Sequence, residues 1–263
     1  MIIAQLLLPG VSEYERKSQQ IDFAALSAEH DVRLGELADA DIVHLYAPRE
    51  IDPKTVRDLR LPYVSNALPK PSMFRKCVQP IRVVTPLKET NDMHIPEAVA
   101  DVYFSNPTTP QPGNRATVGT FIRPTIKNTV EQTAARIQRF RDDVDWLLFD
   151  RPPSPEDLRG VDVWVDPASD ETDFDGFVAE AIAAGTAAVA SRTAINTQRL
   201  EKGRTGVLVP ARDPNEWTHA ILAALFKPEF RQGKIDASQQ TASKFHPRHR
   251  ARALIQLYES ILQ

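Results

Sequence analysis

The sequence predicts an α/β fold in which parallel strands alternate with helices, arranged as two domains. Short apolar runs alternate with stretches of helical periodicity along the chain, which is typical of βα units. Residues 105–115 hold three prolines and a glycine without any apolar period, and this favours a domain boundary. We therefore expect an N-terminal domain over 1–108, a linker over 109–115 and a C-terminal domain over 116–245. Residues 246–263 are expected to form a terminal helix that could pack back on the first domain.

The N-terminal half opens with an apolar strand over residues 2–8. Ser12 and Glu15 have the spacing of a capping box, so a helix is expected to follow. Further short apolar runs are strand candidates: residues 41–46, 63–65, 83–84 and 99–104.

The C-terminal half continues the same alternation. A strand is expected over 116–122, then a helix from Asn128 to about Arg141, then a strand over 146–149. Asp213 precedes proline and has glutamate three residues on, a strong helix start. The last helix is expected to begin at Pro247. Its apolar positions are Ala251, Leu254, Ile255, Tyr258 and Leu262.

Residues 162–190 are the most informative stretch: a strand, an acidic turn, an alanine-rich helix, a glycine and a second strand. The apolar positions of the helix recur at helical spacing: Phe174, Phe177, Val178, Ala181 and Ile182. Glu180 lies off that stripe among alanines, so a ligand could approach its carboxylate. Gly185 is placed for a left-handed C-terminal cap. The helix start, with backbone amides near Gly176 and Phe177, suits an anion, and the whole arrangement suits a nucleotide.

Composition is that of an ordinary globular protein, with 42% hydrophobic and 25% charged residues among 263. The formal net charge of −3 gives no general attraction to nucleic acid or to an acidic membrane, and no nucleic-acid partner is expected. Cys77 is the only cysteine, which excludes an intrachain disulfide and a cysteine-based zinc site and favours a reducing, cytoplasmic location. The apolar start, residues 1–10, is too short to span a bilayer. We expect a cytoplasmic protein, with a peripheral membrane location as the alternative.

The 162–190 block resembles the donor-site segment of GT-B fold glycosyltransferases, specifically the retaining family four. The resemblance continues in the glycine-bracketed strand 203–210 and in the helix opened by Asp213. Upstream, the strand 118–121 followed by Lys127 is similar to the start of that family's C-terminal domain. The resemblance covers about 116–262 and implies two Rossmann-like domains, with the N-terminal one reduced.

The resemblance implies roles for the acids around the turn. Glu180 matches the family's second acid, which binds the ribose hydroxyls of a sugar nucleotide. The first acid, which touches the transferred sugar, falls on Thr172, flanked by Glu171 and Asp173. Either flanking acid could act through a shifted turn as a catalytic group, with Thr172 binding the sugar. The alternative is a solvated acidic loop that caps the helix dipole.

Two cations and a histidine complete the set that the resemblance implies. Lys127 corresponds to the family's diphosphate lysine, and Arg123 is the nearest replacement for an arginine that is Thr120 here. Cations would stabilise the departing diphosphate without a metal. His44, at the end of an apolar strand, matches a histidine on the acceptor side. The alternatives without a catalytic or binding role are two basic residues on an exposed loop and a buried histidine that is hydrogen-bonded within the fold.

A basic stretch, residues 59–88, has no acidic side chain. It could dock a phosphorylated acceptor, a lipid surface or an acidic partner, and a solvated loop is the alternative. Its basic members are Arg60, Lys70, Arg75, Lys76, Arg82 and Lys88.

The resemblance thus implies a retaining, metal-independent glycosyltransferase that uses a nucleoside-diphosphate sugar as substrate and needs no cofactor. The acceptor stays unidentified, and a homo-oligomer stays open. A non-catalytic protein of the same fold, serving as a binding or scaffolding subunit, is the alternative that Thr120 and Thr172 favour. A sugar-nucleotide epimerase is a third, for which the sequence offers no paired acids and histidines.

Overall fold

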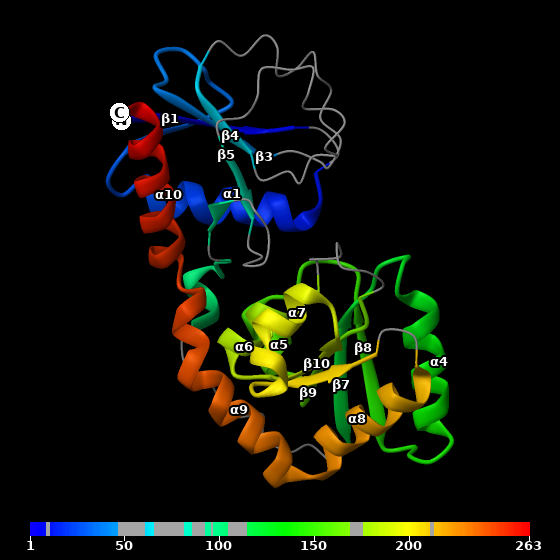
Figure 1. Cartoon of the computed structure of the whole chain (residues 1–263). Helices are drawn as coiled ribbons and strands as arrows, with labels where there is room; N and C mark the ends of the chain where they lie inside the picture. Colours follow the sequence, from blue (N-terminus) through cyan, green and yellow to red (C-terminus); the bar gives the residue numbers. More distant parts are fainter. Residues whose placement is uncertain are drawn as a thin grey trace. The chain divides into compact units, whose positions relative to one another are not determined.

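A computed structural model describes residues 1–8, 11–46, 61–65, 82–85, 93–95, 97–104, 115–168, 176–210 and 213–263 (Figure 1). The chain divides into two compact units. Unit 1 comprises Met1–Ala98 with Phe245–Gln263, and unit 2 comprises Val99–Lys244. Each unit contains one sheet in which every described strand pair is parallel, so the α/β class is confirmed.

The unit 1 sheet has the strand order β2-β1-β3-β4-β5-β6. Its strands are β1 (Ile2–Leu7), β2 (Asp31–Leu34), β3 (Ile42–Tyr46), β4 (Tyr63–Ser65), β5 (Arg82–Thr85) and β6 (Met93–His94). Helix α1 (Glu13–Leu26) begins at the predicted capping box, where the backbone N–H of Ser12 donates to Glu15 Oε2 at 3.0 Å.

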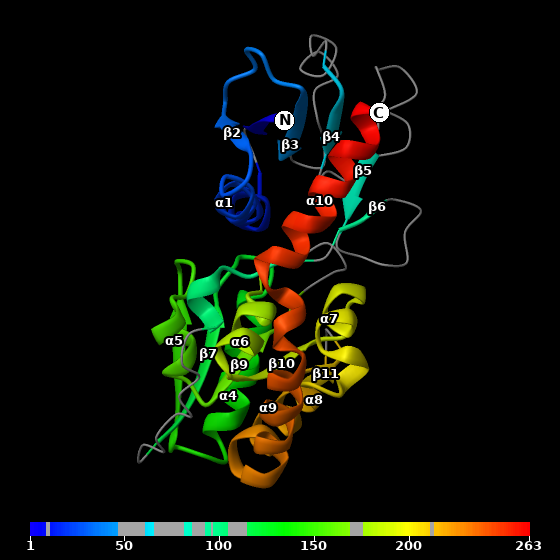
Figure 2. The ribbon, with the colours of Figure 1, turned by 90° about the vertical axis from the view of Figure 1, so that its left-hand side faces the viewer.

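Two helices from opposite ends of the chain cover one face of the unit 1 sheet. Helix α10 (Pro247–Leu262) lies beside α1, and Figure 2 shows it crossing in front of the sheet. Ile3, Ile42 and Val64 of the strands pack against Leu254 of α10 and Leu26 of α1. The amphipathic pattern read from the sequence thus buries most of its apolar stripe. Leu262, however, is exposed at the chain end.

The unit 2 sheet has the order β11-β10-β9-β7-β8. Its strands are β7 (Ala116–Phe121), β8 (Val144–Phe149), β9 (Val163–Asp166), β10 (Ala187–Ser191) and β11 (Val207–Val209). The chain passes from β7 to β8 on one side and from β9 to β11 on the other. The direction of strand succession therefore reverses between β7 and β9.

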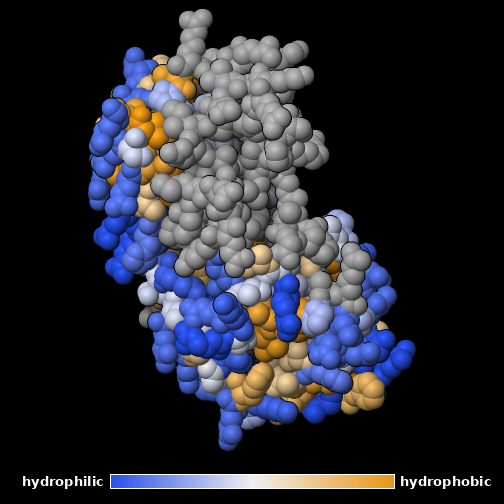
Figure 3. Space-filling view, viewed as in Figure 1, coloured by the Kyte–Doolittle hydropathy of each residue, from blue (hydrophilic) through white to orange (hydrophobic). Residues whose placement is uncertain are grey.

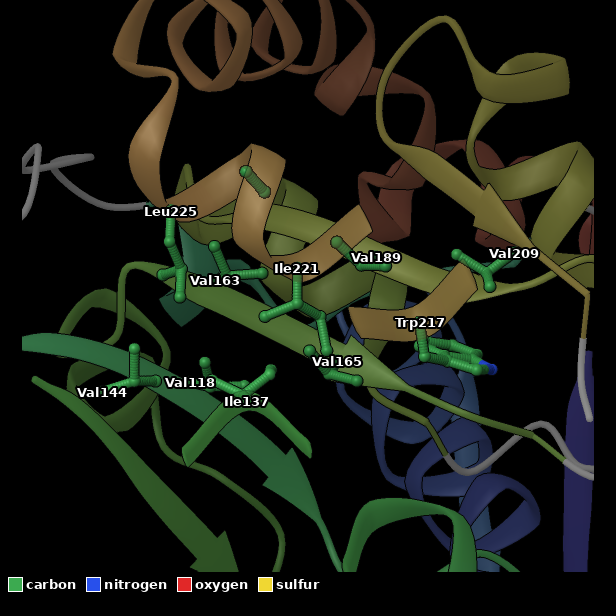
Figure 4. Close-up of a cluster of buried hydrophobic side chains, with 11 residues drawn as sticks. Val118, Ile137, Val144, Val163, Val165, Val189, Val209, Trp217, Ile221 and Leu225 are labelled. Carbon is green, nitrogen blue, oxygen red and sulfur yellow. The ribbon is translucent and has the colours of Figure 1, made fainter. Parts of the chain in front are cut away.

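Helices cover both faces of the unit 2 sheet. They are α4 (Lys127–Gln138), α5 (Pro155–Arg159), α6 (Val178–Ala184), α7 (Ala194–Arg199), α8 (Pro214–Phe226) and α9 (Pro228–Ala242), with short 3₁₀ turns η1 (Asp101–Phe104), η2 (Glu201–Gly203) and η3 (Ser243–Phe245). One core lies under α4 and α8, where Val163 and Val165 of β9 meet Ile221 and Trp217 (Figure 4). The next side chain along β9, Trp164, packs on the other face with α5 and α6. Alternation along β9 therefore sends valines to one layer and Trp164 and Asp166 to the other.

Several sequence expectations need correction. Residues 99–104 do not form a strand. They end in the 3₁₀ turn η1, because a short apolar run does not by itself distinguish strand from helix. Helix α9 was missed because it buries only Ser238 and Ala242, which leaves no apolar period to read. The edge strand β2 was missed for the same reason.

Hydrophilic residues make up most of the described surface seen in Figure 3, with smaller apolar areas between them. No helix among the described residues has both the length and the apolar character needed to cross a bilayer.

Candidate functional site

The carboxyl ends of β7, β9 and β10 meet at one edge of the unit 2 sheet. Ligands of open α/β sheets bind at this edge, where the strand succession reverses. Arg123 follows β7, and Asp166 is the last residue of β9. These two residues therefore lie on the two sides of the reversal. The candidate site is therefore built from Arg123, Asp166 and the segment that opens α6.

Asp166 is the centre of a buried polar cluster. Its Oδ1 accepts a hydrogen bond from Arg123 Nη2 at 2.7 Å, and its Oδ2 accepts one from Asn196 Nδ2 at 3.0 Å. Asp166 and Asn196 are fully buried, and the Arg123 side chain is only 10% exposed. A carboxylate removed from water is tolerated when it is paired and hydrogen-bonded, and this one is both.

Neighbouring residues extend the cluster toward α7. Asn196 also accepts a hydrogen bond at Oδ1 from Arg199 Nη1, at 3.2 Å. Thr193 caps α7 by accepting from the Asn196 backbone N–H at 3.2 Å, which fixes the start of that helix. The hydrogen bonds from Arg123 to Arg199 therefore connect the segments that follow β7 and β10 with the end of β9.

Gly176 is held against the Asp166 carboxylate. A Cβ at position 176 would lie 2.1 Å from Asp166 Oδ2, so only glycine fits there. The Gly176 carbonyl accepts a hydrogen bond from Trp164 Nε1 at 2.7 Å. Gly119 makes room for that indole, because a Cβ on it would lie 2.9 Å from the Trp164 ring. Glycines in β7 and before α6 thus fix the position of one loop.

Phe177 follows in the left-handed conformation, with φ 53°, and caps α6. Its ring is buried and meets the edge of Phe121, with centroids 5.1 Å apart. A non-glycine residue with positive φ stores about 1–3 kcal/mol of strain and persists only when its surroundings enforce it. The buried ring packing provides that enforcement, so the amides at the start of α6 are rigidly placed.

Helix α6 is buried on every side, which corrects the expected amphipathic stripe. All seven residues, Glu180 included, are buried. The helix begins at Val178 and packs against α5, α9 and η1, and Glu180 is not open to solvent, contrary to expectation. Gly185 does adopt the left-handed C-terminal cap, with φ 85°.

Glu180 lies near Tyr103 of η1. Burial raises the pKa of Tyr103, and the nearby Glu180 carboxylate raises it further. The phenol donates a hydrogen bond to the Pro153 carbonyl at 2.7 Å. Tyr103 is therefore held neutral beside a buried acid, an environment that sequence reasoning did not anticipate.

Lys127 opens α4 one turn after Arg123, and its backbone N–H donates to the Arg123 carbonyl at 3.1 Å. Its ammonium lies 3.8 Å from Glu131, and both side chains are more than half exposed. Exposed pairs of this kind contribute little, so Lys127 is available to an incoming anion. Thr120, by contrast, is fully buried in β7.

His44 lies in unit 1, inside a buried network. Its Nδ1 is hydrogen-bonded to Tyr258 Oη at 2.5 Å. Tyr46 Oη donates to Asp22 Oδ2 at 2.6 Å, and Arg250 Nε donates to Asp22 Oδ1 at 2.6 Å. All five side chains are buried. The network ties α1 and α10 to β3, which gives His44 a structural role, and its catalytic role stays a prediction.

The remaining predicted site residues, Glu171, Thr172 and Asp173, lie outside the described residues, as does most of the basic stretch 59–88. Sequence reasoning missed Asp166 and Asn196. A signal for Asp166 existed: it is an acid followed by proline at the end of an apolar strand, where parallel sheets place ligand-binding groups.

Solved structures with this fold cover nearly the whole chain. A glycosyltransferase from Rickettsia africae is 11% identical with a TM-score of 0.72, and the match covers 100% of this chain and 99% of that one. HepE of Anabaena, solved in complex with UDP, is 15% identical with a TM-score of 0.71, over 99% and 100% of the two chains. The chain therefore has the GT-B fold of these glycosyltransferases.

Sequence comparison adds the family. Residues 118–226 match the model of the family of glycosyl transferases group 1. A D-inositol 3-phosphate glycosyltransferase of Corynebacterium jeikeium is 32% identical over 119 residues, 44% of this chain. One of Saccharomonospora viridis is 30% identical over 122 residues, 45% of this chain. Each match spans only 28% of the relative's own length.

Proposed function

We propose that the protein is a glycosyltransferase that takes a sugar from a nucleoside-diphosphate sugar bound by unit 2. The observation that carries the proposal is the construction of the β7–β9 edge. Arg123, Asp166 and Asn196 converge there, beside a loop fixed by Gly176. The match of residues 118–226 to group 1 glycosyl transferases, and the UDP bound to HepE of like fold, support a nucleotide sugar as the ligand.

In this proposal the diphosphate binds the amides near Gly176 and Phe177, together with Lys127 and Arg123. Arg123 already holds Asp166, so a diphosphate would meet a guanidinium whose position is fixed in advance. The leaving diphosphate gains negative charge as the glycosidic bond breaks, and placed cations stabilise that charge without a metal ion. Thr172, Glu171 and Asp173 would contact the transferred sugar, with retention of configuration, and His44 would serve the acceptor.

Glu180 is the proposed ribose ligand. Its carboxylate is fully buried in a helix otherwise made of alanine, valine and isoleucine, and it is the residue that matches the family's ribose-binding acid. A ribose reaches this side chain only if the residues that cover α6 move. Nucleotide binding should therefore change hydrogen exchange in α6.

Calorimetry with UDP, GDP and ADP tests the donor site. We expect one of them to bind, and Glu180→Gln to weaken that binding about tenfold or more, because hydrogen bonds to charged groups contribute about 1.5–3 kcal/mol. Lys127→Gln should weaken it as well. Lys227→Gln is the matched control, since Lys227 is an exposed lysine between α8 and α9. Absence of binding across all three nucleotides would overturn the proposal.

A second candidate is a non-catalytic protein that keeps the fold and the nucleotide site. Thr120 favours it, because the residue in place of the expected arginine is buried and offers no charge to a diphosphate. Nucleotide-sugar binding without release of nucleoside diphosphate, across acceptor mixtures that include phosphorylated inositol, would select this candidate over the enzyme.

A further inference from the structure

An open hollow of ≈ 520 Å³ lies at the outer strand β11 of unit 2. Residues of α7, η2, β11 and α9 line it, together with Arg192, which follows β10. It is within the size range of small-molecule sites. Strand β10 separates β11 from β9, and none of the lining residues belongs to the Arg123–Asp166–Asn196 cluster. The hollow is thus a different place from the proposed donor site.

Among the described residues, three cations and no carboxylate line the hollow: Arg192, Lys202 and Lys234. Lys234 Nζ donates to the Gly203 carbonyl at 2.6 Å, which fixes it on the wall. Burial lowers the pKa of Lys234, as expected for an ammonium that has lost part of its hydration. Grouped like charges repel each other, and an anion among them relieves that repulsion.

The acid next to Lys202 in the sequence is already paired with other cations. Glu201 is ion-paired with Arg204 and with Lys244, whose Nζ lies 3.0 Å from Oε1. The backbone turn at this point is left-handed over three consecutive residues, with φ of 48°, 58° and 94° at Glu201, Lys202 and Gly203. Because a run of that conformation costs energy, the turn that carries Lys202 to the rim of the hollow is held by its surroundings.

An exposed aromatic ring adds an apolar surface to the lining of the hollow. Phe230 of α9 lines the hollow and is 39% exposed, and Lys234 lies over its ring, 5.5 Å from the centroid. A ligand with one anionic end and one apolar or sugar-ring end would satisfy both surfaces.

We propose that this hollow binds a phosphorylated small molecule, with its phosphoryl group between Arg192, Lys202 and Lys234 and its remaining part along Phe230. Arginine and lysine together provide a bidentate fork and mobile ammonium donors for phosphoryl oxygens. The site would hold a second phosphorylated ligand while the donor site is occupied.

Amide NMR with inorganic pyrophosphate as the probe tests this, because the amides of two glycines that line the hollow report on it directly. We expect the resonances of Gly203 and Gly206 to shift with saturation when pyrophosphate is added. The double variant Arg192→Gln, Lys202→Asn should weaken the effect by at least about tenfold, since charged hydrogen bonds are lost. Asparagine tolerates the left-handed conformation at position 202, so the turn is kept. Lys227→Gln, outside the hollow, should leave the titration unchanged.

Two outcomes would overturn the proposal: absent shifts at both glycines at low salt, or equal affinity in the double variant. Vesicles containing an anionic phospholipid distinguish the source of the phosphoryl group. If the protein sediments with these vesicles and the double variant does not, the site binds a lipid headgroup. Pyrophosphate binding without sedimentation would assign it to a free phosphorylated molecule. Because the glycine resonances report on the hollow alone, the result is independent of whether UDP binds.

Discussion

Gly176 lies between two partners, with its carbonyl bonded to Trp164 and its Cα against the Asp166 carboxylate. The sequence singled out this residue for its backbone amide. The requirement for glycine has another origin, because it comes from a carboxylate ten residues earlier in the chain. Gly119 is required for a similar reason, because the Trp164 ring occupies the space that a side chain at position 119 would need.

Gly176→Ala should therefore destabilise unit 2 by about 1–3 kcal/mol, the usual cost of inserting a methyl group into a packed site. It should also abolish nucleotide binding, because the loop or Asp166 must move. Urea unfolding and calorimetry measure the two effects. Gly233→Ala is the control: it lies in α9 with no atom within 4 Å of the new Cβ, and alanine favours the helix. Equal stability of Gly176→Ala and the wild type would contradict this account.

At the scale of elements, α6 and α10 show where a sequence pattern is sufficient and where it fails. The sequence predicted α10 as an amphipathic helix from Pro247, and the structure confirms its start and most of its buried face. For α6 the predicted apolar stripe was too narrow, because the small, weakly apolar alanine side chain does not mark a helix face as buried or exposed. Packing by α5, α9 and η1 buries them all. Small residues allow close approach from any side, so only the tertiary structure decides which side is covered.

The buried network under α10 predicts a loss of stability in alkali. Burial and the Asp22 charge raise the pKa values of Tyr46 and Tyr258 well above the usual 10.0. A raised pKa in the folded state means that the stabilisation is complete below pH 10 and is lost as pH rises beyond it. Each tyrosine that stays protonated in the folded state but ionises in the unfolded chain lowers the free energy of unfolding by about 1.4 kcal/mol per pH unit above 10.

Urea unfolding followed by circular dichroism at pH 8 and at about pH 11 measures this loss. Tyr258→Phe should cost about 1 kcal/mol at pH 8, through the hydrogen bond with His44. It should also reduce the alkaline loss by the contribution of one tyrosine. An unchanged pH dependence in this variant would show that Tyr258 ionises equally in the folded and unfolded chain.

At the scale of the whole molecule, the two units have separate cores, one under α1 and α10 and another under α4 and α8. The chain's three tryptophans, Trp146, Trp164 and Trp217, all belong to unit 2. Tryptophan fluorescence therefore reports the unfolding of unit 2, whereas circular dichroism reports both units.

If unit 2 binds the nucleotide, ligand at about 100 times its dissociation constant should stabilise the tryptophan-detected transition by about 2.7 kcal/mol. Tyr258→Phe, in unit 1, should leave that transition in place and shift only the remaining circular dichroism signal. A nucleotide that stabilises the dichroism signal while the tryptophan midpoint stays fixed would place its site outside unit 2.

The sequence by itself determined the α/β class, the parallel strands and most of the long helices, because apolar periodicity, caps and turn residues act over a few neighbouring positions. It also supplied the glycine and the aromatic that fix the start of α6. Only the tertiary structure decided that Asp166 would join Arg123 to Asn196, that Glu180 would be buried beside Tyr103, and that His44 would be enclosed with Tyr258. These contacts join residues up to 214 positions apart, and no local spacing encodes which distant side chains the packing of a sheet will bring together.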